Sequence, residues 1–89
     1  MRIINVLKRN NAFYWTDKVF SIQPQDKIYQ VYLEETYINR FKAILELQNN
    51  CHIVVSGAPK RVFLNYNLAK NFKEKFYPDG EVCPLFLLH

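Results

Sequence analysis

The stretch TYINRFKAILELQNNCHIVVSGAPKRVFLNY, residues 36–66, carries the clearest structural signals of the chain. Its first part predicts a helix, because apolar residues recur at spacings of three and four: Tyr37, Ile38, Phe41, Ile44 and Leu45. Thr36 is a candidate N-cap, and Asn49-Asn50 is a candidate helix end. The β-branched run 51–55 then predicts a buried strand. A turn at 56–60 and alternating residues at 61–66 predict a hairpin with a second strand.

The flanking segments predict further strands and one more helix. Residues 2–7, 12–15 and 19–22 indicate an N-terminal β-meander. Residues 28–33 fit either a strand or the start of a long helix that begins at Pro24, and their alternation favours the strand. Asn67 is a candidate cap for a helix with an apolar stripe of Leu68, Phe72 and Phe76. Residues 81–88 indicate a last strand, in which Pro84 predicts an edge position or a bulge.

These elements predict one α+β domain over residues 1–89, with an antiparallel sheet and two helices. In residues 27–88 the order is β-α-β-β-α-β, which is typical of the ferredoxin-like split βαβ fold. The N-terminal meander is expected to extend this sheet or to cover one face of it. Eighty-nine residues allow a core of moderate size.

Composition indicates a globular, mildly basic protein. The net charge is +4 and aromatic residues make up 16% of the chain, so large rings must fill much of the core. The sequence has neither a signal-peptide pattern nor an apolar run long enough for a membrane span. We therefore expect a complete, cytoplasmic protein with reduced thiols and no membrane partner. The abundance of Asn, Lys and Ile is typical of AT-rich genomes, including those of phages and mobile elements.

Two groups of residues raise the question of catalysis or metal binding. Cys51 and His52 are adjacent, and neighbours on a strand point to opposite faces, so they are poorly placed to act together. Zinc would need ligands in close pairs, a spacing that Cys51, His52, Cys83 and His89 lack. There is also no glycine-rich phosphate loop. The sequence thus predicts neither an enzyme, nor a metal site, nor a cofactor.

Basic and aromatic residues alternate in the second half of the chain, as single-strand binding requires. The candidate contacts with RNA or single-stranded DNA are Lys60, Arg61, Phe63, Lys70 and Lys73. On a ferredoxin-like sheet, Phe63 and Tyr29 would lie on the open face. The commoner fate of such rings is to fill a core that is poor in glycine.

A protein partner is the function that the sequence favours. Phe13, Tyr14 and Trp15 cannot all point inward from one strand, so at least one large ring should face a partner. The apolar end 85–88 can also add a strand to another chain, including a homodimer through the C-terminal edge. We therefore expect a small non-catalytic inhibitor or adaptor that occludes a protein or nucleoprotein partner. Nucleic-acid binding is the alternative.

Overall fold

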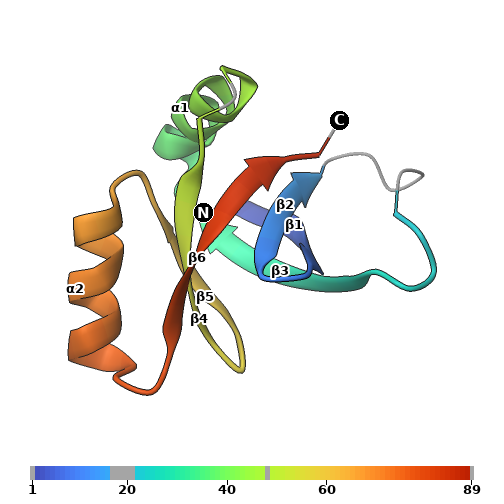
Figure 1. Ribbon diagram of the computed structural model, residues 1–89. Helices are drawn as coiled ribbons and strands as arrows, with labels where there is room; N and C mark the ends of the chain where they lie inside the picture. Colours follow the sequence, from blue (N-terminus) through green and yellow to red (C-terminus); the bar gives the residue numbers. More distant parts are fainter. Residues whose placement is uncertain (1, 17–21, 48, 89) are drawn as a thin grey trace.

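The fold was described from a computed structural model that covers residues 2–16, 22–47 and 49–88 (Figure 1). Within these residues, strands and helices follow each other as β1 Arg2–Arg9, β2 Ala12–Thr16, β3 Lys27–Leu33, α1 Glu35–Glu46, β4 Cys51–Ser56, β5 Ala58–Phe63, α2 Tyr66–Phe76 and β6 Glu81–Leu87. The prediction of a small α+β domain is confirmed. Residues 28–33 lie in a strand, so the alternative of a long helix from Pro24 is wrong.

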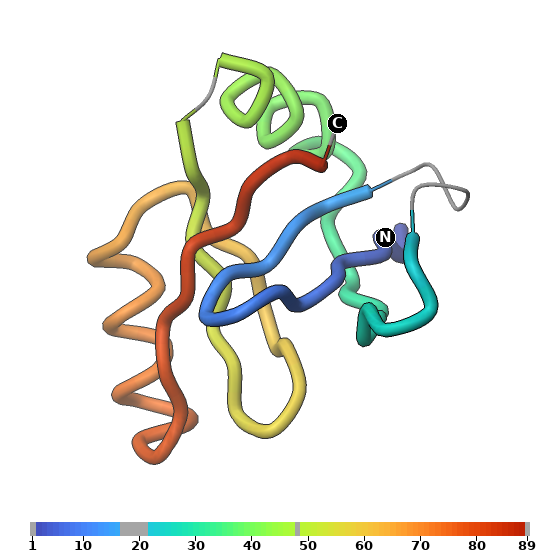
Figure 2. The backbone as a smooth tube through the Cα atoms, turned by 45° about the vertical axis from the view of Figure 1, so that its right-hand side comes forward, coloured from blue at the N-terminus to red at the C-terminus, as the bar shows by residue number. Residues whose placement is uncertain are grey.

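The described strands form one mixed sheet in the order β3-β1-β2-β6-β4-β5. The pair β2–β6 is parallel, and the other pairs are antiparallel. The sheet curls until its two edge strands, β3 and β5, approach each other, so the architecture is that of a nearly closed barrel (Figures 1 and 2). The two strands do not pair along this seam.

The strand pairing corrects the ferredoxin-like prediction. The order of elements over residues 27–88 is as predicted, but the sheet order differs because the β1–β2 hairpin lies between β3 and β6. The expected all-antiparallel sheet is likewise wrong, since β2 and β6 are parallel. The meander is completed by β3, which returns to pair with β1. The predicted third strand at 19–22 falls mostly outside the described residues.

The interior of the barrel is filled by side chains from all six strands, and α1 closes one end of it. Ile38, Phe41 and Leu45 of α1 join the same buried cluster as Ile4 and Trp15. The helix stripe seen in the sequence is therefore the face that packs against the barrel. The second helix, α2, lies along the outside of β4, β5 and β6 (Figure 1), where Ala69 is fully buried.

Two helix starts lie earlier than predicted. The N-cap of α1 is Glu34, whose backbone is extended and whose side chain makes no capping hydrogen bond, and Thr36 lies inside the helix. The N-cap of α2 is Asn65, whose side chain accepts a hydrogen bond from the backbone N–H of Asn67 at 2.7 Å. Asn65 thus ends the extended segment, which is why the predicted strand at 61–66 is too long at its C-terminal end.

The β4–β5 hairpin has a tighter turn than predicted. Ser56 pairs with Ala58, and only Gly57 separates them, with φ at +72°. Pro59 is accommodated within β5 because the register shifts between Val54 and Val55, which is a β-bulge or similar irregularity. The predicted two-residue turn at Asn10-Asn11 is confirmed, and Asn10 adopts positive φ there.

Strand β6 lies between β4 and β2 in the sheet order, but Pro84 itself has a neighbour strand on one side only, as an edge position predicts. It pairs with β4 on one side and with β2 on the other. The missing N–H of Pro84 is tolerated because the pairing with β2 begins only at Leu85. Residues 81–84 of β6 pair only with β4 and residues 86–87 pair only with β2, so Leu85 alone has a neighbour strand on both sides.

An ion pair fixes the start of β3 to the end of β1. Arg9 donates from Nε to Asp26 Oδ1 at 3.1 Å and from Nη2 to Asp26 Oδ2 at 2.8 Å. The backbone N–H of Gln23 donates to the same carboxylate at 3.0 Å. The hydrogen bonds from Arg9 and Gln23 lower the pKa of Asp26, because they stabilise its ionised form.

Candidate nucleic-acid interface

A cavity of about 650 Å³ opens at the seam between β3 and β5. We call it the seam groove. Its walls come from the end of β3, the first half of α1, the edge strand β5 and the start of α2, and its lining residues are Tyr32, Leu33, Glu34, Tyr37, Arg40, Phe41, Lys60, Arg61, Val62, Phe63, Leu64 and Leu68. The groove exists because the sheet curls without closing, so the side chains of both edges face one space.

The charge of the seam groove is predominantly positive. Arg40, Lys60 and Arg61 line it together with one carboxylate, Glu34. Among the residues that the structure describes, no carboxylate forms an ion pair with Arg40, Lys60 or Arg61. Instead, the Arg61 guanidinium lies 5.3 Å from the ring centre of Phe63. A ring holds a cation in place without neutralising it, which leaves the charge available to an anion.

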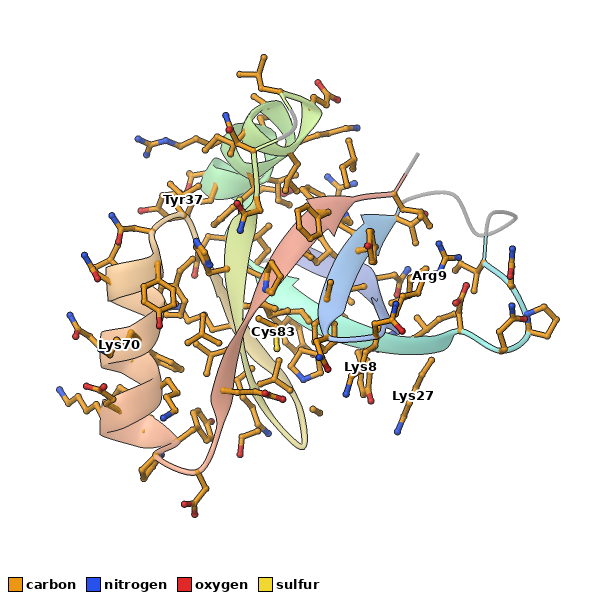
Figure 3. The ribbon with its side chains drawn as sticks, viewed as in Figure 1. Lys8, Arg9, Lys27, Tyr37, Lys70 and Cys83 are labelled. Carbon is orange, nitrogen blue, oxygen red and sulfur yellow. The ribbon has the colours of Figure 1, made fainter. Side chains whose placement is uncertain are left out.

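Two tyrosines of the seam groove are free to stack against a ligand. Tyr32 is 63% exposed and Tyr37 is 43% exposed, although both line the cavity. Tyr37 also rests edge-on against Phe41 at a centroid distance of 6.3 Å, which orients it. Figure 3 shows Tyr37 on α1, close to the loop that leads into α2. The groove therefore combines exposed rings with unpaired cations, the two groups that bases and phosphates require.

The structure brings together three of the five residues predicted to contact nucleic acid. Lys60, Arg61 and Phe63 all line the seam groove. Lys70 and Lys73 do not, because they lie on another side of α2, and Figure 3 shows Lys70 pointing away from the sheet. The helical spacing places Leu68, rather than Lys70, at the groove.

The residues that sequence reasoning missed are Tyr32, Tyr37 and Arg40. The outward position of Tyr32 could have been predicted from the sequence, because this residue lies between Val31 and Leu33, which face inward on the strand. The expected role of Tyr29 is wrong, because its ring faces inward and lies 6.1 Å from that of Phe13. Tyr37 was assigned to the core stripe of α1. Only the position of β5 beside the helix shows that it borders a cavity.

Of the three rings predicted to bind a protein partner, Phe13, Tyr14 and Trp15, the fold buries two and turns one outward. Phe13 and Trp15 are 1% and 6% exposed, and both belong to the core. They are two residues apart on β2, so the pleat of the strand directs both rings to the same, inward face. Tyr14 is the ring that points outward, but it is half-buried and lies 5.6 Å from Phe86. Phe13 and Trp15 are therefore core residues in this fold.

The thiols and the imidazole occupy separate environments. Cys51 and Cys83 are buried free cysteines, and Figure 3 shows Cys83 inside the curled sheet. Burial raises the pKa of the Cys51 thiol to about 11. His52 faces the other side of β4, where it packs against Tyr66 at 5.4 Å, and burial lowers its pKa. Over residues 2–16, 22–47 and 49–88, no three potential metal ligands converge.

Comparison of the chain with known protein families, characterised proteins and solved structures found no match to any of them. None of the helices in the described part of the chain has the length and apolar character needed to cross a membrane.

Proposed function

We propose that this protein is a non-catalytic binding protein that holds a single-stranded nucleic acid in the seam groove. One observation carries the proposal: three unpaired cations and two exposed tyrosines converge on one open cavity from segments that are distant in the sequence. Phosphates would lie against Arg40, Lys60 and Arg61. Bases would stack on the rings of Tyr32 and Tyr37, and this stacking does not depend on sequence because every base has a flat π-face.

Unpaired strands fit this arrangement better than a duplex does. In a duplex the bases are stacked inside and cannot reach Tyr32 or Tyr37, so only the phosphate contacts would remain. The groove also lies between two sheet edges, and the described helices α1 and α2 form its walls, so neither is placed to enter a major groove there. The net charge of +4 supports only weak binding of phosphates, so base stacking must supply the rest of the affinity.

The test is a titration of labelled single-stranded and duplex oligonucleotides, RNA and DNA, followed by fluorescence anisotropy. We expect the single strands to bind more tightly than the duplexes. Tyr32→Ala should weaken single-strand binding by about 1–3 kcal/mol, the usual contribution of one base–aromatic stack. Because Tyr32 is exposed, its replacement should leave the melting temperature nearly unchanged. Equal affinity for duplexes and single strands, or a neutral Tyr32→Ala, would refute the proposed mode.

A protein or nucleoprotein partner is the second candidate function, in the manner of an inhibitor or adaptor from a phage or mobile element. The observation in its favour is the pair of open sheet edges, since β3 and β5 each lack a neighbour on the seam side. Open edges can accept an added strand. A pull-down with and without nuclease separates the two candidates. A partner retained after nuclease, with affinity insensitive to salt between about 50 and 200 mM, would favour a protein ligand.

A further inference from the structure

A continuous row of aromatic rings leads out of the seam groove along α2. Phe63 lines the groove, and its ring centre lies 5.2 Å from that of Phe72. Phe72 in turn lies 4.9 Å from Phe76 and 5.9 Å from Tyr77. We call these four rings, Phe63, Phe72, Phe76 and Tyr77, the ring shelf. The shelf adjoins the groove directly, because Phe63 belongs to both.

Three cations lie over the ring shelf. The Arg61 guanidinium is 5.3 Å from the ring centre of Phe63 and 5.6 Å from that of Phe72. The ammonium groups of Lys60 and Lys75 lie 5.5 Å and 5.4 Å from the rings of Tyr77 and Phe76. No carboxylate of the described chain pairs with any of the three. Their positive charges are thus positioned along one path and remain unneutralised.

The ring shelf is not simply the buried face of α2. Ala69 is the one fully buried residue of the helix, whereas Phe76 is 56% exposed and Leu68 is 57% exposed. Leu68, Phe72 and Lys75 stand at i, i+4 and i+7, so they share the side of the helix that faces the groove. Lys70 and Glu74 share another side at i, i+4. On the groove side of α2, the exposed apolar side chains of Leu68 and Phe76 therefore alternate with Lys75. On another side, Tyr66, which is 50% exposed, shares a helical face with Lys70 and Lys73.

This alternation fits a polyanion with flat apolar units better than it fits an apolar protein surface. An apolar partner would have to desolvate Lys60, Arg61 and Lys75 without compensating their charges. A nucleic-acid strand offers a phosphate for each cation and a base for each exposed ring. From Leu68 to Phe76 the helix rises by about 12 Å. At a stacked spacing of about 3.4 Å, that distance has room for about three nucleotides.

We propose that a strand bound in the seam groove continues over the ring shelf, with phosphates against Lys60, Arg61 and Lys75 and a base on Phe76. The ligand is then a strand of several nucleotides and not a mononucleotide or a dinucleotide. This inference rests on the proposed function of the groove. It adds Lys75 and Phe76 to the site, two residues that do not line the cavity itself.

The test is the affinity for a series of oligothymidylates from about two to about sixteen nucleotides long, the range of site sizes of small single-strand binding domains. For the wild-type protein we expect the affinity to rise with length and then to level off. The variant K75A/F76A should bind the shortest oligonucleotides like the wild type. It should bind the long ones at least about fivefold more weakly, the loss expected for one stack. The variant K70A/K73A is the matched control on the other side of α2 and should behave like the wild type.

Because Phe76 contacts Phe72, K75E serves as a second variant that leaves every ring in place. It should weaken the binding of long oligonucleotides and spare the short ones. The ring shelf is overturned if affinity does not depend on length, or if K75A/F76A and K75E are both neutral or weaken short and long strands equally. In those cases the groove can still bind. If no oligonucleotide of any length binds the wild-type protein, the groove and the shelf are both overturned.

Discussion

Replacing Lys60 and Arg61 together by alanine should lower the salt dependence of nucleic-acid binding. Both side chains are exposed, line the seam groove and lack a carboxylate partner in the described part of the chain. Each phosphate contact of a single strand contributes about 0.7 to the slope of log affinity against log salt, so the slope should fall by about 1.4. Between about 50 and 200 mM salt, the wild type should thus lose about sevenfold more affinity than K60A/R61A.

The assay is a series of anisotropy titrations at several salt concentrations, with K70A/K73A as the matched control. This control also removes two positive charges, but from a side of α2 that does not line the groove. It therefore changes the net charge equally while leaving the local contacts intact, and its slope should match that of the wild type. If the two double variants show the same slope of log affinity against log salt, the reasoning is refuted. In that case the net charge of the protein, and not the cations at the groove, would set the salt dependence. Thermal melting of both variants excludes a loss of folded protein.

Three further predictions concern the core, the ion pair and the thiols. Trp15→Ala should destabilise the protein by about 3–5 kcal/mol, because it empties a core position that is 6% exposed; urea unfolding measures this, and an unchanged midpoint with lost binding would contradict the core position. Asp26→Asn should destabilise the protein at neutral pH. A carboxylate with a depressed pKa contributes stability above its unfolded value of 3.8, and this stability is lost as the pH falls through the folded pKa, so the difference between variant and wild type should vanish in acid. A deficit of equal size at both pH values would argue against the Arg9 contact. Cys51, with its pKa raised to about 11, should react with a thiol reagent only as fast as the protein unfolds; rapid labelling of the native protein would show an accessible thiolate.

Local structure was largely predictable because its causes are local. The stripe of Ile38, Phe41 and Leu45 predicts a helix and its buried face without reference to the rest of the chain. The alternation of residues 28–33 likewise predicts which side chains of β3 face inward. The predicted ends of two elements are wrong for local reasons. Asn65 caps α2 two residues before the predicted cap, Asn67, and Pro59 is part of β5 because the register of the hairpin shifts.

The sheet order and the groove were not predictable, because both depend on pairing between distant segments. The element order over residues 27–88 suits several sheets, and the β1–β2 hairpin decides among them by lying between β3 and β6. Pro84 predicts a position with a single neighbour strand, and at Pro84 itself β6 pairs only with β4. In this fold the second neighbour begins one residue later, at Leu85. Lys60, Arg61 and Phe63, which were predicted together as nucleic-acid contacts, all line the groove because they lie on one strand.

The sequence by itself determined the α+β class, most of the elements and the inward faces of α1 and β3, since these follow from the periodicity of apolar residues. It also determined the supply of cations and rings, but not where they meet. Tertiary structure alone decided that Trp15 is core, that β6 is central and that Tyr32, Tyr37 and Arg40 face Lys60 and Arg61 across an open seam. The physical reason is that curling of the sheet brings β3 and β5 together. That approach depends on every strand pair between them and on no single stretch of the chain.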